Sequence, residues 1–428
     1  MHAVGRLHTA LGRLTPTLDH QCYLRTVIAD PLQQALGLAT LAAVATMVLV
    51  LASRRAMQPV RVLALCSFAG HTVLGIGIWY LMPALVAGDA FVYEAQAEGA
   101  LEARAGKEGF AIFLGGLYRV TGPTPAAGLL FNAALMGLLV IVVARTAGRL
   151  GGKRAARYGA LIAVLLPPFV WWGSQLLREA PMWILIALAA DMAVAMAMDG
   201  LSWRRGASLL LISLAMFTIR APVAAVLVVF LAIGLILASS PRPGDHARRV
   251  ALIVGAIAIA LFLFPRSDAL QSLETQDSAS IVNSRNYLAT ANTGFGEQAA
   301  TTTSGLYGQL PTALPLVVFG PLPWQLASSE LAAVADTFAW WFVLYLAWRG
   351  FVPLRRRVGR ASLLLLVPTA ALLGVLALTL ANFGIVIRMR AMAVVLLVPY
   401  AAVGLAVLAE RRRGRAYDAA PERLSGVA

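Results

Sequence analysis

The sequence predicts an all-α membrane protein, a polytopic bundle of about 11 transmembrane helices. Two properties of its 428 residues lead to this prediction: 60% of them are hydrophobic, and only 13% are charged. Such a composition lies outside the usual range of soluble globular proteins. The apolar residues also form repeated runs of about 18–25 residues, the length that a helix needs to cross a hydrocarbon core about 30 Å thick.

The apolar runs divide the chain into an N-terminal segment (1–30), a transmembrane domain (31–410) and a basic tail (411–428). No cleavable signal peptide is predicted in the N-terminal segment. The run at 207–219 is too short to cross a bilayer comfortably, so we expect it to be tilted, broken or paired with its successor as a re-entrant unit. The expected spans are 33–53, 62–86, 126–145, 158–175, 181–198, 207–219, 222–239, 250–265, 326–348, 361–381 and 391–409.

The formal net charge of +15 could indicate a nucleic-acid-binding protein, but the distribution of the basic residues favours a membrane protein without nucleic acid as a partner. Alternate connections between the spans, with the tail, contain 23 of the 35 Lys and Arg residues in short clusters. By the positive-inside rule, these connections and the tail are cytoplasmic. The N-terminal segment and the loops at 87–125, 266–325 and 382–390 are then expected to face outward, and membrane lipids are the expected surroundings.

The predicted outer loops differ from the short cytoplasmic ones. Loop 87–125 alternates acidic and basic residues at helical spacing, and its apolar part, Phe110–Pro123, is too short to span and is expected to be an interfacial helix. Loop 266–325 is long and polar and ends in an apolar, Pro-rich piece, Leu310–Trp324, that could lie along the membrane surface. Loops of this length are usually functional or disordered.

Ionisable residues near the ends of the predicted spans gather on the outer side. Charges at this depth are costly, so they tend to face a shared polar cavity and to mark a site. Asp89, the first acid after the second span, is the candidate catalytic base, and Glu94 is expected to support it. The candidate substrate-binding residues are Tyr93, Arg178, Glu179, Arg220, Trp324, Arg388 and Arg390.

These residue types suit group transfer from a phosphate-linked lipid. The planar guanidinium of arginine binds phosphate through two parallel hydrogen bonds and keeps its charge. A carboxylate within hydrogen-bond reach of an acceptor hydroxyl can act as its general base. Arginines that bind the leaving phosphate, together with one base, would form a minimal glycosyl-transfer site, and no protonating acid is strictly needed.

A structural role is the competing interpretation for each candidate. Asp89 could be a solvated acid at a helix end. The adjacent pair Arg178 and Glu179 could form a local ion pair or a headgroup anchor. Arg388 and Arg390 could be headgroup-binding residues at the rim of the bundle.

Three ionisable residues lie deeper in the predicted spans: His71, Asp191 and Asp336. We expect His71 to form an interhelical hydrogen bond, and the two acids to be either buried, hydrogen-bonded structural residues or functional ones. The two cysteines, Cys22 and Cys66, lack metal-ligand spacing, so neither a disulfide nor a zinc site is predicted. No cofactor is predicted; outer acids could bind a divalent cation together with a lipid phosphate, but no ligand spacing requires one.

Several short motifs resemble known envelope proteins. Gly88–Tyr93, after an early span, resembles the first outer loop of the GT-C superfamily, multispanning glycosyltransferases that use polyprenyl-phosphate sugars and whose usual catalytic base is an acid in this loop. Pro167–Ser174, Ile219–Pro222, Pro321–Trp324 and Asn382–Arg390 resemble a largely uncharacterised group of bacterial envelope proteins.

The resemblance implies a GT-C-like helical fold and a role in surface polysaccharide or glycoconjugate assembly at the bacterial inner membrane, with the active face outward. The implied donor is a polyprenyl-phosphate-linked sugar, and the acceptor is a glycan or a lipid-linked molecule. A polysaccharide polymerase of the EpsG or Wzy kind, using lipid-pyrophosphate oligosaccharides, is the closest alternative; a lipid-oligosaccharide flippase and an envelope scaffold are others. The sequence departs from the GT-C pattern in having no tandem acid pair at Asp89 and no soluble outer domain after the last span.

Overall fold

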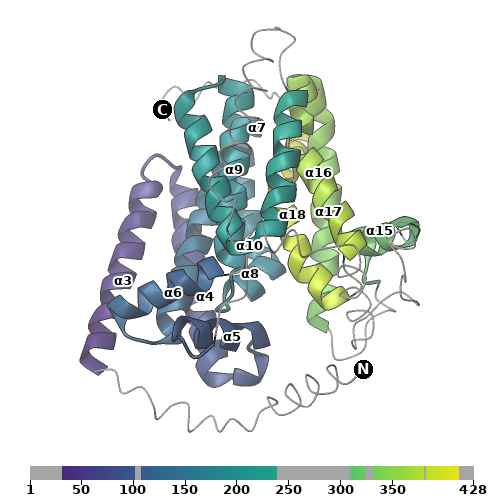
Figure 1. The fold of residues 1–428 in the computed structure, drawn as a ribbon. Helices are drawn as coiled ribbons and strands as arrows, with labels where there is room; N and C mark the ends of the chain where they lie inside the picture. Colours follow the sequence, from purple (N-terminus) through teal and green to yellow (C-terminus); the bar gives the residue numbers. More distant parts are fainter. Residues whose placement is uncertain are drawn as a thin grey trace.

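The computed structural model describes residues 31–101, 108–238, 308, 310–322, 331–379 and 382–413, and these residues form helices and no β-strand (Figure 1). In chain order the elements are α3 (Pro31–Ala52), α4 (Gln58–Leu81), η1 (Pro83–Leu85), α5 (Gly88–Ala97), α6 (Glu108–Thr121), α7 (Pro125–Leu165), α8 (Pro167–Gly173), α9 (Glu179–Asp199), α10 (Trp203–Leu237), α15 (Leu310–Phe319), α16 (Leu331–Val358), η4 (Gly359–Leu363), α17 (Leu366–Thr379) and α18 (Phe383–Arg412).

The described helices confirm an all-α membrane protein but not the expected number of spans. Six of them are long and apolar enough to cross a membrane, or up to seven if the bent pair formed by α16 with η4 and α17 counts as one span. The expected span at 250–265 lies outside the described residues. The count also differs because two of the six helices each join two of the expected segments.

Helix α7 joins the segments expected at 126–145 and 158–175 through the basic stretch between them. At Gly152 the backbone takes φ 76°, a left-handed conformation that glycine adopts without steric cost. A Cβ atom added to Gly159 would lie 3.0 Å from that of Ala147, whereas twelve residues of straight helix span about 18 Å. The chain therefore reverses at Gly152, and α7 is a helical hairpin whose second arm ends at Leu165.

Helix α10 also changes direction, at Arg220, where φ is −158° and ψ is 78°, close to Pro222. Ser213 in the first arm and Leu231 in the second line the same small cavity. Eighteen residues of straight helix would hold them about 27 Å apart. The short segment 207–219 is therefore paired with its successor, one of the three expected arrangements, and Arg220 lies at the turn.

Helix α18 is the centre of the bundle and packs against α7, α9, α16 and α17. It crosses α16 closely at Gly350 and Gly404, where a Cβ atom on either glycine would collide with a backbone carbonyl oxygen of the other helix. Small residues let helix backbones approach, and the resulting van der Waals contact holds helices together in lipid. This crossing fixes the position of the helix that carries Arg388.

The outer helices present apolar side chains outward. Most of α3 is exposed, including Leu36 and Met47. Phe338, Phe342 and Tyr345 of α16 are also exposed and recur at helical spacing. An apolar surface of this extent suits contact with lipid tails, because a hydrocarbon solvent places no penalty on it.

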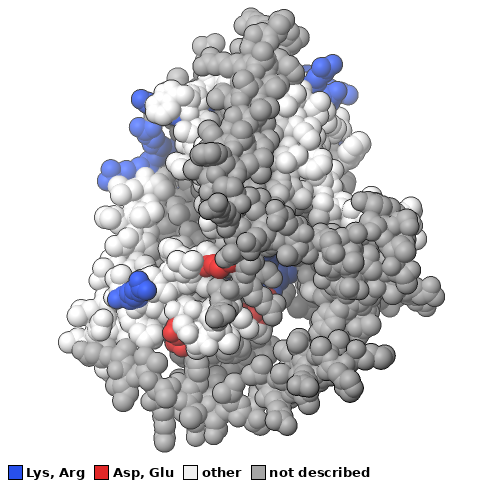
Figure 2. Space-filling view, viewed as in Figure 1, with Lys and Arg blue, Asp and Glu red and all other residues white. Residues whose placement is uncertain are grey.

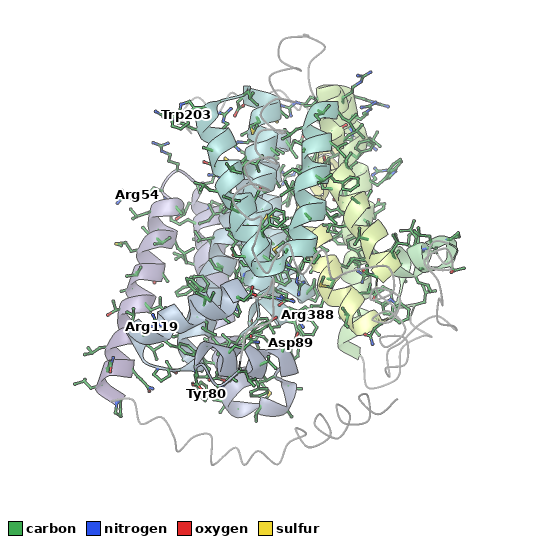
Figure 3. The ribbon with its side chains drawn as sticks, viewed as in Figure 1. Arg54, Tyr80, Asp89, Arg119, Trp203 and Arg388 are labelled. Carbon is green, nitrogen blue, oxygen red and sulfur yellow. The ribbon has the colours of Figure 1, made fainter. Side chains whose placement is uncertain are left out.

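The predicted cytoplasmic connections and the predicted outer segments lie at opposite ends of the bundle. At the end that we call the basic end, Arg357 donates a hydrogen bond to the carbonyl oxygen of Leu150 at 3.0 Å, so two of the predicted cytoplasmic loops meet there. Figure 3 places Arg54 at the same end, and Asp89 and Arg388 toward the other, which we call the site end. This separation agrees with the alternation of loops that the sequence predicts.

The expected loop at 87–125 is largely helical in its described residues. Helix α6 (Glu108–Thr121) matches the helix expected at Phe110–Pro123, and it packs on α3, α5 and α10. Of the expected loop at 266–325, residues 308 and 310–322 are described, and α15 occupies the Pro-rich piece. Helices α5 and α6 pack against each other toward the site end of the bundle (Figure 1).

The crossing of α16 and α18 predicts unequal effects for two glycine substitutions. Gly350→Ala places a Cβ against the Tyr400 carbonyl oxygen and should destabilise the protein by about 1–3 kcal/mol. Gly374→Ala is the matched control, because no atom lies within 4 Å of its added Cβ. Thermal unfolding of the purified proteins in detergent checks this, and equal melting temperatures for the two variants would contradict the crossing.

Candidate functional site

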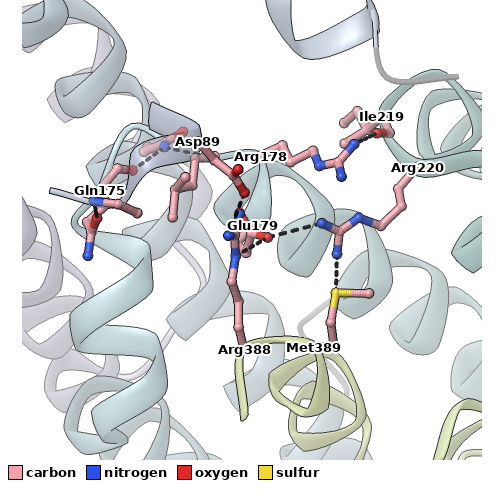
Figure 4. Close-up of polar contacts among 11 residues, drawn as sticks. Asp89, Gln175, Arg178, Glu179, Ile219, Arg220, Arg388 and Met389 are labelled. Carbon is pink, nitrogen blue, oxygen red and sulfur yellow. Dashed lines mark hydrogen bonds and ion pairs between the residues drawn. The ribbon is translucent and has the colours of Figure 1, made fainter. Parts of the chain in front are cut away.

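Residues from four distant segments meet at the site end (Figure 4). Asp89 lies in the first turn of α5, Arg178 and Glu179 at the start of α9, Arg220 at the turn of α10, and Arg388 in α18. We call these five residues the Glu179 cluster. Because its members are up to 299 positions apart, the tertiary fold and not local sequence assembles them.

Glu179 is the centre of this cluster. Its Oε1 atom accepts hydrogen bonds from Arg388 Nε at 2.7 Å and from Arg220 Nη2 at 3.2 Å, and its side chain is fully buried. A carboxylate out of contact with water remains charged only when it is paired and hydrogen-bonded. Glu179 therefore balances and orients two arginines that come from different helices.

Asp89 lies at the open edge of the cluster. Its Oδ2 atom accepts a hydrogen bond from Arg388 Nη1 at 2.7 Å. The Asp89 side chain is 57% exposed, whereas that of Glu179 is 0% exposed. Arg388 thus links a buried carboxylate to an accessible one, and only the accessible one can meet a substrate that arrives from outside the bundle.

Arg178 completes the cluster beside aromatic rings. Its Nη1 atom donates to the Ile219 carbonyl oxygen at 3.2 Å, and its guanidinium carbon lies 5.8 Å from the centroid of the Tyr93 ring. Arg388 lies similarly over Trp172, at 5.7 Å. Aromatic faces attract cations most strongly where water is excluded. Burial also raises the pKa of the Tyr93 phenol, so this group stays protonated and can donate a hydrogen bond.

Two buried amides hold the backbone that carries these side chains. Asn132 Nδ2, in α7, donates to the carbonyl oxygens of Gln175 and Leu177, each at 2.8 Å. Gln175 Oε1 accepts from the backbone N–H of Ala87 at 2.7 Å, just before α5. The turn before α9 and the start of α5 are therefore fixed to each other and to α7.

The cluster has more positive charge and more hydrogen-bond donors than it uses internally. Arg178 Nε and Arg388 Nη2 are buried donors that make no hydrogen bond with a described residue. Within the cluster, Glu179 Oε2 is the one buried acceptor that accepts no hydrogen bond from a described residue. An unsatisfied buried donor costs about 1–3 kcal/mol, and more when it is charged. Three arginines also face two carboxylates. Both properties suit the binding of an anion.

Arg390, which was predicted to bind substrate beside Arg388, is not part of the cluster. The two residues are two positions apart on a helix, so the directions of their side chains differ by about 200° around the helix axis. Arg390 Nη1 donates to the carbonyl oxygens of Gly320 at 2.6 Å and Val317 at 3.3 Å, and Nη2 donates to Asp336 at 3.2 Å. Its buried side chain joins α18 to α15 and α16, so its position is that of a structural residue.

Two further predicted residues are Glu94 and Trp324. Glu94, which was expected to support Asp89, is buried in α5, at 1% exposure. Trp324 lies outside the described residues. The described residues also contain no group of three or more His, Cys, Asp or Glu side chains that could hold a metal ion.

Two of the deeper ionisable residues have structural partners. His71 Nε2 in α4 lies 3.1 Å from the Phe169 carbonyl oxygen in α8, which confirms the predicted interhelical hydrogen bond. The buried Asp191 pairs with Arg145 at 2.6 Å and with Arg149 at 2.7 Å. Asp191 therefore fits the structural alternative, at the basic end and away from the cluster.

No known family model matches this sequence, and no curated protein matches it either. The resemblance to the GT-C superfamily therefore remains a prediction from short motifs. The chemistry of the cluster has to be argued from its own geometry.

Sequence reasoning missed Asn132 and Gln175, which position the cluster, and Met389, whose sulfur contacts Arg220. Asn132 carries a detectable signal, because it is a lone amide in the apolar run 126–145. The contact of the Trp172 ring with Arg388 was not predicted either. Nothing in the sequence singles out Met389.

The central position of Glu179 predicts a large loss of stability for Glu179→Gln. This change leaves Arg220 and Arg388 buried with one charge partner fewer, which should cost about 3–5 kcal/mol. The matched control is Asp199→Asn, which removes an exposed carboxylate whose ion pair with Arg205, at 3.3 Å, lies at the surface, and it should change stability by less than about 1 kcal/mol. Thermal unfolding in detergent measures both, and a stable Glu179→Gln protein would show that the cluster does not depend on this charge.

Proposed function

We propose that this protein is a membrane glycosyltransferase that transfers a sugar from a polyprenyl-phosphate donor to an acceptor hydroxyl. The observation that carries the proposal is that one accessible carboxylate, Asp89, lies beside three arginines, which have a surplus of positive charge and two of which have unpartnered donors. This combination can bind a lipid phosphate and accept a proton a short distance away. The short motifs that resemble the GT-C superfamily add support.

In the proposed reaction, the acceptor oxygen forms a bond to the anomeric carbon, and the bond from that carbon to the phosphate oxygen breaks. The electron pair of the broken bond stays on the lipid phosphate, whose charge becomes more negative by one. Asp89 takes the proton of the acceptor hydroxyl. The surplus positive charge of the arginines stabilises the charge that develops on the leaving phosphate.

The two carboxylates of the cluster have different proposed roles. Asp89 is exposed and contacts the reacting hydroxyl, so it is the catalytic base. Glu179 is buried against Arg388 and Arg220, so it is a positioning residue and does not touch the substrate, although the sequence suggested that it binds substrate. Arg178 and Arg388 provide the unpartnered donors for the phosphate.

The proposed setting is the outer face of a bacterial inner membrane. Under the positive-inside rule the basic end is cytoplasmic, so the cluster at the opposite end faces outward. An outward site suits the assembly of surface polysaccharide or another glycoconjugate, in which the donor's polyprenyl chain lies in the bilayer and its headgroup reaches the cluster. In this proposal the arginines supply the positive charge at the phosphate, and no resident cofactor takes part.

The proposal predicts that Asp89→Asn removes transfer activity while the protein is produced normally. Asparagine cannot accept the hydroxyl proton, and loss of a general base typically slows a reaction by about 10²–10⁴-fold. Cells with this variant should accumulate the same lipid-linked donor as a full deletion. Extracted lipids are measured by mass spectrometry, and membrane protein levels by immunoblot.

Glu98→Gln is the matched control, since it removes an exposed carboxylate nine residues along the same segment. Its donor pool should equal that of the wild type. A normal donor pool in Asp89→Asn cells, combined with accumulation in the deletion, would refute Asp89 as the base. The mass of the product also separates transfer of a single sugar from polymerisation of oligosaccharide units.

A further inference from the structure

A second site lies at the basic end of the bundle, far from the Glu179 cluster. A cavity of about 720 Å³ opens between the connection of α3 to α4 and the hairpin of α7. Apolar side chains, among them Leu51, Val60 and Ile141, form much of its lining. Figure 2 shows Lys and Arg side chains gathered at the upper left of the molecule, where Figure 3 labels Arg54.

The charge around this cavity has one sign. The residues that line it include five bases and no acid: Arg54, Arg55, Arg145, Arg149 and Lys153. Asp191 does not line the cavity, but its buried carboxylate pairs with both Arg145 and Arg149 and holds these two bases in place. Arg145 and Arg149 share the single negative charge of Asp191, and Arg54 adds a further positive charge, so these residues give the cavity wall a surplus of positive charge.

The shape and position of the cavity select a lipid over a small anion. A phosphate ion would fill only a small part of 720 Å³ and would leave the apolar lining in contact with water. Leu51, which lines the cavity, is also exposed on α3, the helix with the least buried surface among the candidate spans. The cavity is therefore continuous with a surface that faces lipid tails.

We propose that this cavity binds one anionic phospholipid from the adjacent leaflet. The phosphate of the headgroup would contact the bases, and the upper part of the acyl chains would cover the apolar lining. Basic pockets between membrane helices recognise anionic headgroups through this combination of charge and apolar contact. Lipid in this position would hold α3 and α4 against the α7 hairpin, so binding should stabilise the folded protein.

The test uses the full-length protein, purified in a neutral detergent and titrated with phosphatidylglycerol, phosphatidylcholine or inorganic phosphate. Phosphatidylglycerol should raise the melting temperature, and native mass spectrometry should show one retained molecule. The triple variant Arg54→Gln/Arg55→Gln/Lys153→Gln should bind it about 10–100-fold more weakly. Arg145 and Arg149 stay unchanged in this variant because they compensate the buried Asp191.

Two further variants distinguish lipid binding in the cavity from general attraction of the lipid to surface charge. Arg355→Gln/Arg356→Gln/Arg360→Gln removes the same charge from exposed positions that do not line the cavity, and it should bind like the wild type. Ala52→Trp adds a bulky ring at a residue that lines the cavity while keeping every charge, and it should weaken the retention of the lipid. The proposal is overturned by equal binding of phosphatidylcholine, by equal stabilisation from phosphate alone, by equal losses in the two triple variants, or by an unaffected Ala52→Trp protein.

Discussion

The structure of the site end depends on the burial of one carboxylate, that of Glu179, between two arginines from distant helices. Removing ions from water is expensive, and only close pairing with hydrogen bonds offsets that cost. Arg220 reaches Glu179 from the turn of α10, and Arg388 reaches it from the central helix α18. The ion network therefore fixes how α9, α10 and α18 meet. It also leaves Arg388 able to hold Asp89 at an accessible edge.

Buried ions at the two ends of the bundle share one design but differ in their surroundings. At the basic end, Asp191 holds Arg145 and Arg149, and at the site end Glu179 holds Arg220 and Arg388. In each case a single acid orients two arginines and compensates only one of their two positive charges. An anionic lipid group is the natural ligand for such an arrangement in a membrane, since water and mobile counterions are scarce there.

The sequence predicted the helical membrane class, the placement of alternate connections at opposite ends, and the residues of the Glu179 cluster. Composition and the spacing of charges along the chain carry this information directly. It could not predict that Arg388 and Arg390 diverge, because both follow the same expected turn and only the start of the α18 helix at Phe383 sets their directions. The count of candidate spans is lower than the expected 11 partly because the chain reverses at Gly152 and Arg220 within α7 and α10, so each of these helices contains two of the segments that the sequence separates.

The sequence also could not predict which residues hold the backbone of the cluster in place. Asn132 acts through two backbone carbonyl groups some 43 and 45 positions away, so its role appears only when α7 is packed beside the turn before α9. Such contacts belong to tertiary structure, and a single sequence contains no direct record of them.

Photo-cross-linking with a diazirine-bearing polyprenyl-phosphate sugar would test most directly whether the Glu179 cluster binds a lipid phosphate. The purified protein is irradiated with the probe in lipid nanodiscs, and the labelled peptides are mapped by mass spectrometry. Our account predicts labelling in residues 87–94, 172–179 and 383–390, suppressed by excess unlabelled polyprenyl phosphate. Competable labelling confined to the basic end, or no competable labelling at all, would contradict it.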